Sequence, residues 1–429
     1  MIDKLKKISL GNWILIAMVL GLIFGLFLNF KVHDPFIKDV IFMDNVFYIG
    51  GNLFIKLMKM LVVPLVFCSI VVGVASISDI KTLGSIGATT IIIYLITTAI
   101  AVTVALGIGM LIKPGLGLNM ISVSQGANVT VNQTMADTIL NVVPDNPISS
   151  LANGDMLPVI IFAVLVGIIL AKLRKETNLI NDFFAQGNKV MMEMTSIVMK
   201  FAPIGVFCLM AKTFGSLGME GVIPLSKYFI CVIIGLAIQV FITYPSLLVL
   251  FTRLNPIKFF KKFTSVMFFA FSSSTSNATI PLNMDKLSEM GVSRDVSSFT
   301  IPLGATINMD GTAIMQGVAV MFAAQAYGID LGTSALLTVI FTAVMASIGT
   351  AGVPSVGLVT LTMVFNSIGL PIEAIGIIFG IDHILDMFRT AVNITGDAIC
   401  TIIVSFRNKA MDVDIFNGKK KFKEPKHIL

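Results

Sequence analysis

Charged residues recur every three or four positions inside a strongly apolar stretch near the C-terminus, FGIDHILDMFRTAVNITGDAICTIIV, which is long enough to cross a bilayer. The polar positions are Asp382, Asp386, Arg389, Asn393 and Asp397. At about 100° per residue they fall within an arc of roughly 100° and spread along about 22 Å of helix. Four charges facing lipid would cost about 10 to 14 kcal/mol, so this face must contact protein, water or a ligand. An ionisable stripe at membrane depth indicates transport.

The composition is that of an integral membrane protein, because 56% of the 429 residues are hydrophobic and only 13% are charged. The formal charge of +6 does not indicate nucleic-acid binding, since the basic residues lie in short clusters between apolar runs, where lipid headgroups and topology explain them. The four cysteines show no metal-ligand or paired spacing, and we expect them to be packing residues. The N-terminal apolar run is long and no cleavage site follows it, so we expect an uncleaved first helix.

Eight apolar segments have the length of a membrane-spanning helix. They run over 12–29, 46–74, 84–112, 156–171, 188–211, 222–251, 297–325 and 374–406. An even number places both termini on one side, and the side that then carries more lysine and arginine is predicted to be the cytoplasm. The segment from about 114 to 155 is rich in Gly, Asn, Ser and Thr and is predicted to be an extracellular loop without regular structure.

Two further apolar stretches are interrupted by small residues and a proline. FSSSTSNATIP (271–281) interrupts 256–290, and SIGTAGVPSVG (347–357) interrupts 333–370. Backbone opened at membrane depth is tolerated only where it is buried in protein or lines a cavity, so each stretch is predicted to be a re-entrant helical hairpin. The first enters from the cytoplasm and the second from outside, which makes an inverted repeat whose interrupted segments indicate a binding site near the midplane.

The helix after the first hairpin contains GATINMDGT (304–312) in the middle of an apolar run. Asn308, Asp310 and Gly311 are all poor at continuing a helix, and a break there would free carbonyl oxygens. Carbonyl oxygens together with a carboxylate suit a hard cation such as sodium. The alternative is a buried aspartate that only caps a kinked helix.

In the last helix, Arg389 offers a planar fork suited to a carboxylate, and Asp386 could receive an ammonium group. The alternative is that these two side chains, at i and i+3, pair with each other. The serine hydroxyls and free amides of the hairpin tips favour a ligand, because they could hold a further carboxylate. The predicted core contains four aspartates and one arginine, which leaves three net negative charges that bound cations would neutralise. These residues are Asp310, Asp382, Asp386, Asp397 and Arg389.

The motifs FSSSTSNATIP, NMDGT, GTAGVP and DMFRTAVNITGD, in this order over nearly the whole chain, resemble the glutamate transporter family, the dicarboxylate/amino acid:cation symporters. The resemblance implies a prokaryotic sodium-coupled importer of aspartate or glutamate in the inner membrane, and not an enzyme. It implies an all-α polytopic fold of eight transmembrane helices and two re-entrant hairpins, a homotrimer, and an elevator mechanism.

The resemblance also implies the parts of the elevator. The fixed scaffold is implied to comprise helices one and two (1–83) and, after the insertion, helices four and five (114–215). The moving part is implied to comprise helix three (84–113), helix six (216–255) and a transport core (256–410), and a basic cytoplasmic tail follows (411–429).

The site residues implied by the resemblance form one substrate site and three sodium sites. In the substrate site, Asp386 would hold the substrate amine, and Arg389 with Thr312 would hold its side-chain carboxylate. Asn393 and Ser276 would hold the α-carboxylate and amine end, and Thr390 belongs to the same set of residues. The hairpin around Gly352 and Val353 would close over the site. One sodium site would use Asp397 with backbone oxygens of Gly304, Asn308 and Asn393. A second would use backbone oxygens around Thr306, Ser347, Ile348 and Thr350, and the third would use Tyr94, Thr97, Thr98, Asn308 and Asp310.

The residues at two positions of this sequence narrow the class of substrate that we expect. Relatives for C4-dicarboxylates generally lack an acid at the position of Asp386, and relatives for neutral amino acids generally replace the arginine at the position of Arg389. The presence of both points to an acidic amino acid. Gln316 stands where potassium-countertransporting animal members carry a protonatable glutamate, so that form of coupling is not expected. Ser274 replaces an arginine of the archaeal member, so gating details are not carried over.

Three alternatives stay open from the sequence. The first is a proton-coupled glutamate or C4-dicarboxylate symporter. The second is an intramembrane aspartyl protease that uses Asp310 and Asp397, although two facing carboxylates that share a proton would not be expected beside an arginine and two hairpins. The third is a channel, against which the occluding hairpins argue.

Overall fold

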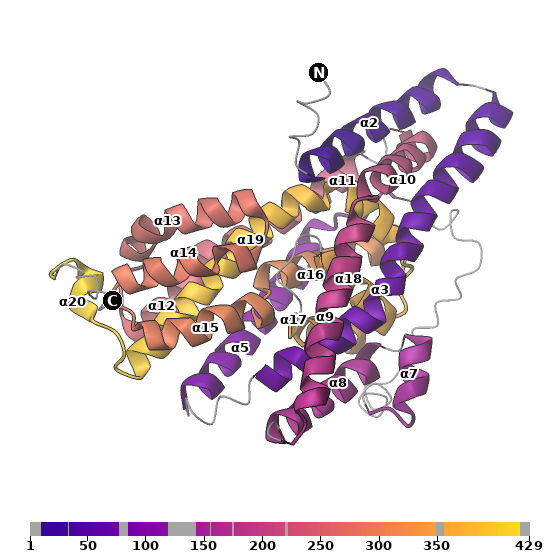
Figure 1. Cartoon of the computed structure of the whole chain (residues 1–429). Helices are drawn as coiled ribbons and strands as arrows, with labels where there is room; N and C mark the ends of the chain where they lie inside the picture. Colours follow the sequence, from indigo (N-terminus) through magenta and orange to yellow (C-terminus); the bar gives the residue numbers. More distant parts are fainter. Residues whose placement is uncertain are drawn as a thin grey trace, which may run out of the picture.

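The computed structural model describes residues 10–32, 34–76, 85–118, 143–154, 156–173, 176–218, 222–348 and 356–420. Within these ranges the chain is all-α and contains no β-strand, as the family resemblance implies (Figure 1). The first half comprises α2 (Leu10–Lys31), the π-helix η1 (Phe36–Val46), α3 (Phe47–Ser76), α5 (Ser85–Ile112), α7 (Pro147–Asn153), α8 (Met156–Lys172), α9 (Asn178–Met199) and α10 (Ala202–Leu217). The second half comprises α11 (Val222–Ile238), the π-helical turn η4 (Gln239–Thr243), α12 (Tyr244–Thr252), α13 (Pro256–Ser273), α14 (Ser276–Glu289), α15 (Arg294–Ile307), α16 (Asp310–Ala326), α17 (Thr333–Ser347), α18 (Val356–Ser367), α19 (Glu373–Arg407) and α20 (Val413–Asn417).

Three helices of the described chain are long and apolar enough to cross a bilayer: Ile86–Ile112, Val222–Thr252 and Ile381–Arg407. The pair α9 and α10 makes a fourth if it counts as one span, but it bends by 52°. The prediction of one continuous helix over 188–211 was therefore wrong, because α9 and α10 divide this segment. The bend coincides with Pro203 in the first turn of α10, where a proline is tolerated because its missing N–H would have no helical partner.

The segment from about 114 to 155, predicted to be a loop without regular structure, contains the short helix α7 over Pro147–Asn153, so the prediction was wrong there. Asn146 caps this helix by accepting from the N–H groups of Ile148 and Ser149, at 3.0 and 3.2 Å, and Pro147 stands in its first turn. Gly154 ends the helix at φ 76°, a left-handed conformation that glycine adopts without strain. The described ranges exclude residues 119–142, so the rest of that prediction is untested.

The two interrupted stretches each form a pair of helices that pack against each other. α13 ends at Ser273, the residue after it, Ser274, has φ 50°, and α14 starts at Ser276, so the predicted interruption inside 271–281 is confirmed. The connection between α17 and α18 falls mostly in 349–355, outside the described residues. The predicted break in the NMDGT segment is also confirmed, because Asn308 and Met309 separate α15 from α16 with non-helical backbone.

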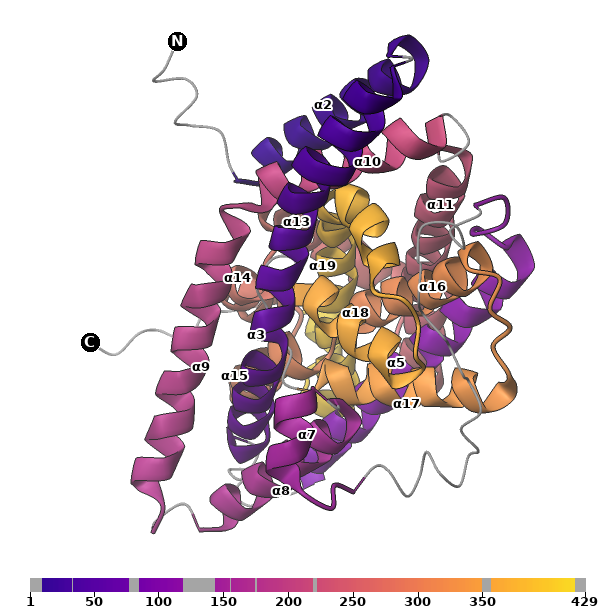
Figure 2. The ribbon, with the colours of Figure 1, turned by 90° about the vertical axis from the view of Figure 1, so that its right-hand side faces the viewer.

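Helix α19 is the centre of the molecule (Figures 1 and 2). It packs against helices from both halves of the chain: α2, α5, α10, α11, α12, α13, α14, α15, α16 and α18. Its span from Ile381 to Arg407 is 83% buried over the most apolar window, compared with 50% for the span on α5. The polar stripe of α19 therefore faces protein along its length, as the cost of exposing it to lipid requires.

The helices outside this centre pack largely among themselves. α2 lies along α10, and α3 packs on α8, α9 and α10 (Figure 2). A small second hydrophobic core fills the space between α2, η1, α3 and α10, and it consists of Leu28, Met43, Phe47, Cys208 and Ala211.

Candidate functional site

All five polar residues of the α19 stripe are buried. Arg389 and Asp397 are 0% exposed, Asp382 is 1% and Asp386 is 7% exposed. Asn393 lies between Arg389 and Asp397 along the helix and is 4% exposed. A fully buried charge needs a partner, and the two ends of the stripe find different ones.

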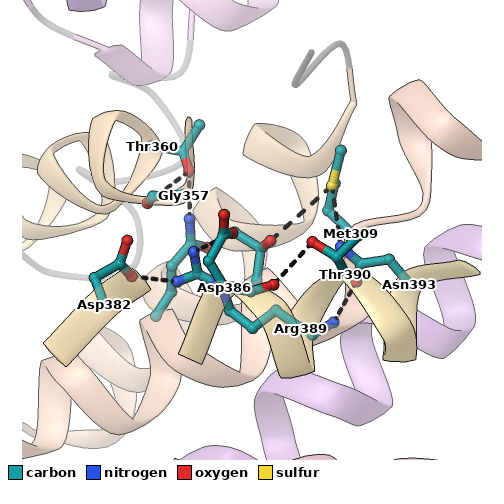
Figure 3. Close-up of polar contacts among 11 residues, drawn as sticks. Met309, Gly357, Thr360, Asp382, Asp386, Arg389, Thr390 and Asn393 are labelled. Carbon is teal, nitrogen blue, oxygen red and sulfur yellow. Dashed lines mark hydrogen bonds and ion pairs between the residues drawn. The ribbon is translucent and has the colours of Figure 1, made fainter. Parts of the chain in front are cut away.

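Arg389 binds two carboxylates at once. Its Nη1 donates to Asp382 Oδ1 at 2.6 Å, and its Nη2 donates to Asp386 Oδ1 at 2.7 Å (Figure 3). The pairing between Asp386 and Arg389 that the sequence left open is therefore formed in the structure. Arg389 Nε has no hydrogen-bond partner among the described residues. Because Nε and Nη2 form the side edge of the guanidinium fork, this edge could take a two-oxygen ligand if Asp386 turned away.

Helices α16 and α18 cover the Arg389 side chain. A Cβ built on Gly357 of α18 would lie 3.1 Å from Arg389 Nη2 and 3.1 Å from the Thr312 methyl group. Gln316 of α16 donates to Thr360 Oγ1 at 2.8 Å, and that hydroxyl donates to the Gly357 carbonyl at 3.0 Å. This chain of bonds joins α18 to α16 next to the Arg389 side chain, and Figure 3 shows the bond between Thr360 and Gly357.

The break between α15 and α16 places Met309 against the stripe. Asn393 Nδ2 lies 3.3 Å from the Met309 sulfur, and the Thr312 hydroxyl lies 4.0 Å from it. Asn393 Oδ1 accepts from the Gly311 N–H at 2.7 Å. Thr390 donates back to the Asp386 carbonyl of its own helix at 2.8 Å. Met309 was missed by the sequence analysis, although it lies inside the NMDGT motif.

Asp310 begins α16 and turns one carboxylate oxygen, Oδ1, toward helix α5. Thr98 Oγ1 lies 2.6 Å from Oδ1, and Thr97 Oγ1 lies 3.4 Å from it. Both hydroxyls are also 2.9 Å from the Tyr94 carbonyl oxygen, and Thr97 Oγ1 is 3.5 Å from Asn308 Oδ1. Five oxygens thus gather around only two hydroxyl protons, because each hydroxyl donates once. Such an oxygen-rich and proton-poor cluster fits a hard cation.

Asp397 lies on the other side of the same break. Asn308 Nδ2 donates to Asp397 Oδ1 at 2.8 Å and to the Asn393 carbonyl at 3.3 Å. Asp397 Oδ2 has no hydrogen-bond partner among the described residues. A Cβ on Gly304 would lie 2.5 Å from Asp397 Oδ1 and 2.7 Å from the Tyr94 hydroxyl, so only glycine allows this close approach. The structure therefore brings Tyr94, Gly304, Asn308, Asn393 and Asp397 together, and the buried partnerless carboxylate oxygen also fits a cation.

Other predicted residues are not joined to these groups. Thr306 donates to the Leu303 carbonyl at 2.9 Å and Ser347 to that of Val344 at 2.7 Å. No hydrogen bond between described residues links Thr306 with Ser347 or Ile348. Ser276 is buried at the start of α14 without a hydrogen bond to Asp386 or Arg389 in the described chain. Thr350, Gly352 and Val353 lie outside the described residues.

Two residues missed by the sequence analysis complete the surroundings of Asp310. Gln239 Nε2 and the Tyr244 hydroxyl both donate to Asp310 Oδ2, each at 2.9 Å. They come from η4 and α12, within a predominantly apolar span. The available signal was Gln239 itself, since a polar side chain at membrane depth is costly unless it has a partner.

Comparison with known proteins places the whole chain beside membrane transporters. A family model described as the sodium:dicarboxylate symporter family matches residues 10–406. The chain is 36% identical to a proton/sodium-glutamate symport protein of Bacillus caldotenax over 410 residues, which cover 94% of this chain and 95% of that protein. It is 34% identical to the proton/glutamate-aspartate symporter of Escherichia coli (strain K12) over 414 residues, 93% of each chain. It is also 34% identical to the neutral amino acid transporter B(0) of Bos taurus over 387 residues, 82% of this chain and 72% of that protein.

Proposed function

Because the chain belongs to the sodium:dicarboxylate symporter family, we propose that it imports aspartate or glutamate by coupling their uptake to the entry of sodium. The observation that carries this proposal is the charge arrangement of the buried stripe. One end holds an arginine flanked by two carboxylates, whereas Asp397 at the other end, and Asp310 on α16, have uncharged donors only. An amino acid with an extra carboxylate suits the first end, and sodium suits the second.

Substrate binding would exchange one ion pair for two. The ammonium group of the amino acid would take the place of Arg389 at Asp386, and its side-chain carboxylate would bind the Nε and Nη2 edge of Arg389. Asp382 would keep its bond to Nη1, so the guanidinium would stay oriented during the exchange. The rest of the substrate would be surrounded by Asn393, Thr312, Thr390 and Ser276. Gly352 and Val353 would cover it.

Sodium would neutralise the remaining negative charge. The oxygen cluster of Tyr94, Thr97, Thr98, Asn308 and Asp310 would form one site, and Asp397 with the backbone around Gly304, Asn308 and Asn393 a second. A third would use the backbone around Thr306, Ser347, Ile348 and Thr350. A sodium ion that enters down a tenfold gradient and 100 mV releases about 3.7 kcal/mol, enough to drive accumulation.

The proposal extends to the architecture. The chain would cross a bacterial inner membrane eight times with both termini in the cytoplasm, and α13–α14 and α17–α18 would be re-entrant hairpins. The packing of α2 on α10 and of α3 on α8 and α9 supports a scaffold of these helices, against which α5 and α11 to α19 would move as an elevator. Three copies would assemble through the scaffold.

The test is uptake into proteoliposomes with purified protein. The wild type should accumulate L-aspartate and L-glutamate when sodium is outside. Asp386→Ala should weaken aspartate binding by at least about 100-fold, or about 2.7 kcal/mol, because a buried charge contact to the ammonium is lost. Binding of succinate, which has no ammonium group to pair with Asp386, should not fall. Equal losses for both ligands would refute the role of Asp386.

The names of the relatives favour one second candidate, proton coupling. Replacing sodium by choline under an inward pH gradient separates the two. Full uptake in choline would establish proton coupling and refute sodium coupling, whereas calorimetric binding of L-aspartate only in sodium would establish the reverse.

A further inference from the structure

The span from α11 to α12 contains a π-helical turn at its middle. The turn η4 covers Gln239–Thr243, and the Tyr244 N–H donates to the Gln239 carbonyl, five residues back. In a regular α-helix, residues five apart are separated by about 500° of rotation, which leaves their side chains roughly 140° apart. The five-residue hydrogen bond instead brings position 244 over position 239. Single π turns inside α-helices are frequently found at functional sites.

The turn brings two donors to a single oxygen. Gln239 Nε2 and Tyr244 Oη both donate to Asp310 Oδ2, each at 2.9 Å, and the two residues are 1% and 0% exposed. Helix α19 makes room for this contact at Gly396, where a Cβ would lie 2.3 Å from Tyr244 Oη. Without the π turn, these two side chains would point to different faces of the helix.

We propose that Gln239 and Tyr244 are positioning residues for the cation site at Asp310. They hold Oδ2 from one side, so that Oδ1 faces Thr98 at 2.6 Å and the oxygen cluster on α5. The carboxylate cannot rotate without breaking both bonds, and its orientation toward the cation is thereby fixed. This inference rests on the proposed function, because it assigns the cluster to sodium. It adds the span α11–α12 to a site whose expected ligands come from other helices.

The variants for the test are Tyr244→Phe and Gln239→Met, which remove the donors and keep most of the side-chain volume. The matched control is Tyr228→Phe. Tyr228 lies on α11, is 0% exposed, and has a hydroxyl without a hydrogen-bond partner among the described residues. Sodium affinity is measured without amino acid, by calorimetry or by the sodium-dependent shift in melting temperature. Aspartate affinity is then measured at saturating sodium.

We expect each variant to weaken sodium binding by about tenfold, with aspartate affinity at saturating sodium within about twofold of wild type. Tyr228→Phe should bind sodium like the wild type. In an Asp310→Asn background, Tyr244→Phe should cause no further loss, since Tyr244 acts through Asp310. A purely structural role would instead lower both affinities in either background.

Two results would overturn the inference. The first is wild-type sodium affinity in both Tyr244→Phe and Gln239→Met. The second is an equal loss in Tyr228→Phe, which would attribute the effect to packing of the helix. If the wild-type protein itself shows no sodium-dependent binding, the proposed function fails, which is distinguishable from failure of the variants alone.

Discussion

The two ends of the buried stripe on α19 differ in how their charge is balanced. At the Arg389 end, which comprises Asp382, Asp386 and Arg389, the chain supplies its own ion pairs at 2.6 and 2.7 Å. At the Asp397 end, with which we group Asp310 of α16, the partners are threonine, tyrosine and amide groups without charge. A buried carboxylate with only neutral partners is costly. The Arg389 end therefore has its own compensating charge, and the neutral partners of the Asp397 end support the proposal that a cation binds there.

The largest effect is expected from Arg389→Ala. It leaves two buried carboxylates facing each other without a positive charge, so the protein should lose about 3 to 5 kcal/mol of stability in sodium-free buffer. Uptake of acidic amino acids should be lost as well. Melting temperature in detergent and aspartate uptake in proteoliposomes are the measurements.

Arg294→Ala is the matched control for that experiment. Arg294 pairs with Asp285 at 2.8 Å, but both side chains are more than half exposed, at 61% and 57%. Exposed pairs contribute little to stability, so this variant should melt and transport like the wild type. If the two arginine variants had the same melting temperature, the Arg389 end would not depend on its own ion pairs.

A smaller effect of opposite sign is expected from Asp397→Asn. This change removes a buried carboxylate whose Oδ2 has no hydrogen-bond partner in the described chain. The stability of the protein in sodium-free choline buffer should therefore stay the same or rise. Stabilisation by sodium should decrease, because a ligand present at 100 times its Kd contributes about 2.7 kcal/mol only while its site is intact. Melting curves in sodium and in choline report both quantities.

Asp382→Asn serves as the control at the other end. It weakens one bond to Arg389 and leaves the Asp397 end unchanged, so the difference in melting temperature between sodium and choline should persist. A loss of stability for Asp397→Asn in choline would mean that the carboxylate is already satisfied by the protein, and the contrast between the two ends would be lost.

The burial of both ends could be predicted from the sequence, because the cost of exposing charges to lipid leaves one solution for the stripe. The break at Asn308 and Met309 could also be predicted, since NMDG continues a helix poorly. Whether Asp386 pairs with Arg389 could not be decided, because i and i+3 spacing allows both a pair and a ligand.

Gln239 indicated a buried polar contact, but its joint contact with Tyr244 to one carboxylate oxygen could not be predicted, for a different reason. Reading the span with an α-helical period places them on separate faces, and nothing local in the sequence specifies the π turn that brings them together. The bend between α9 and α10 was missed because the apolar run continues through it, and hydrophobicity does not record helix direction.

The smallest effects are expected from adding one methyl group at each end. The Cβ of Gly304→Ala would lie 2.5 Å from Asp397 Oδ1, and the Cβ of Gly357→Ala would lie 3.1 Å from Arg389 Nη2. The first contact requires the carboxylate to move, so sodium affinity should fall by about tenfold, or about 1.4 kcal/mol, with aspartate affinity at saturating sodium retained. The second requires a shift of a few tenths of an ångström, so aspartate affinity should fall by about threefold, with sodium affinity in the absence of amino acid unchanged.

Gly107→Ala is the control, because nothing lies within 4 Å of a Cβ there. Should either glycine variant lower both affinities together while Gly107→Ala lowers neither, the two ends would act as one site and not as two.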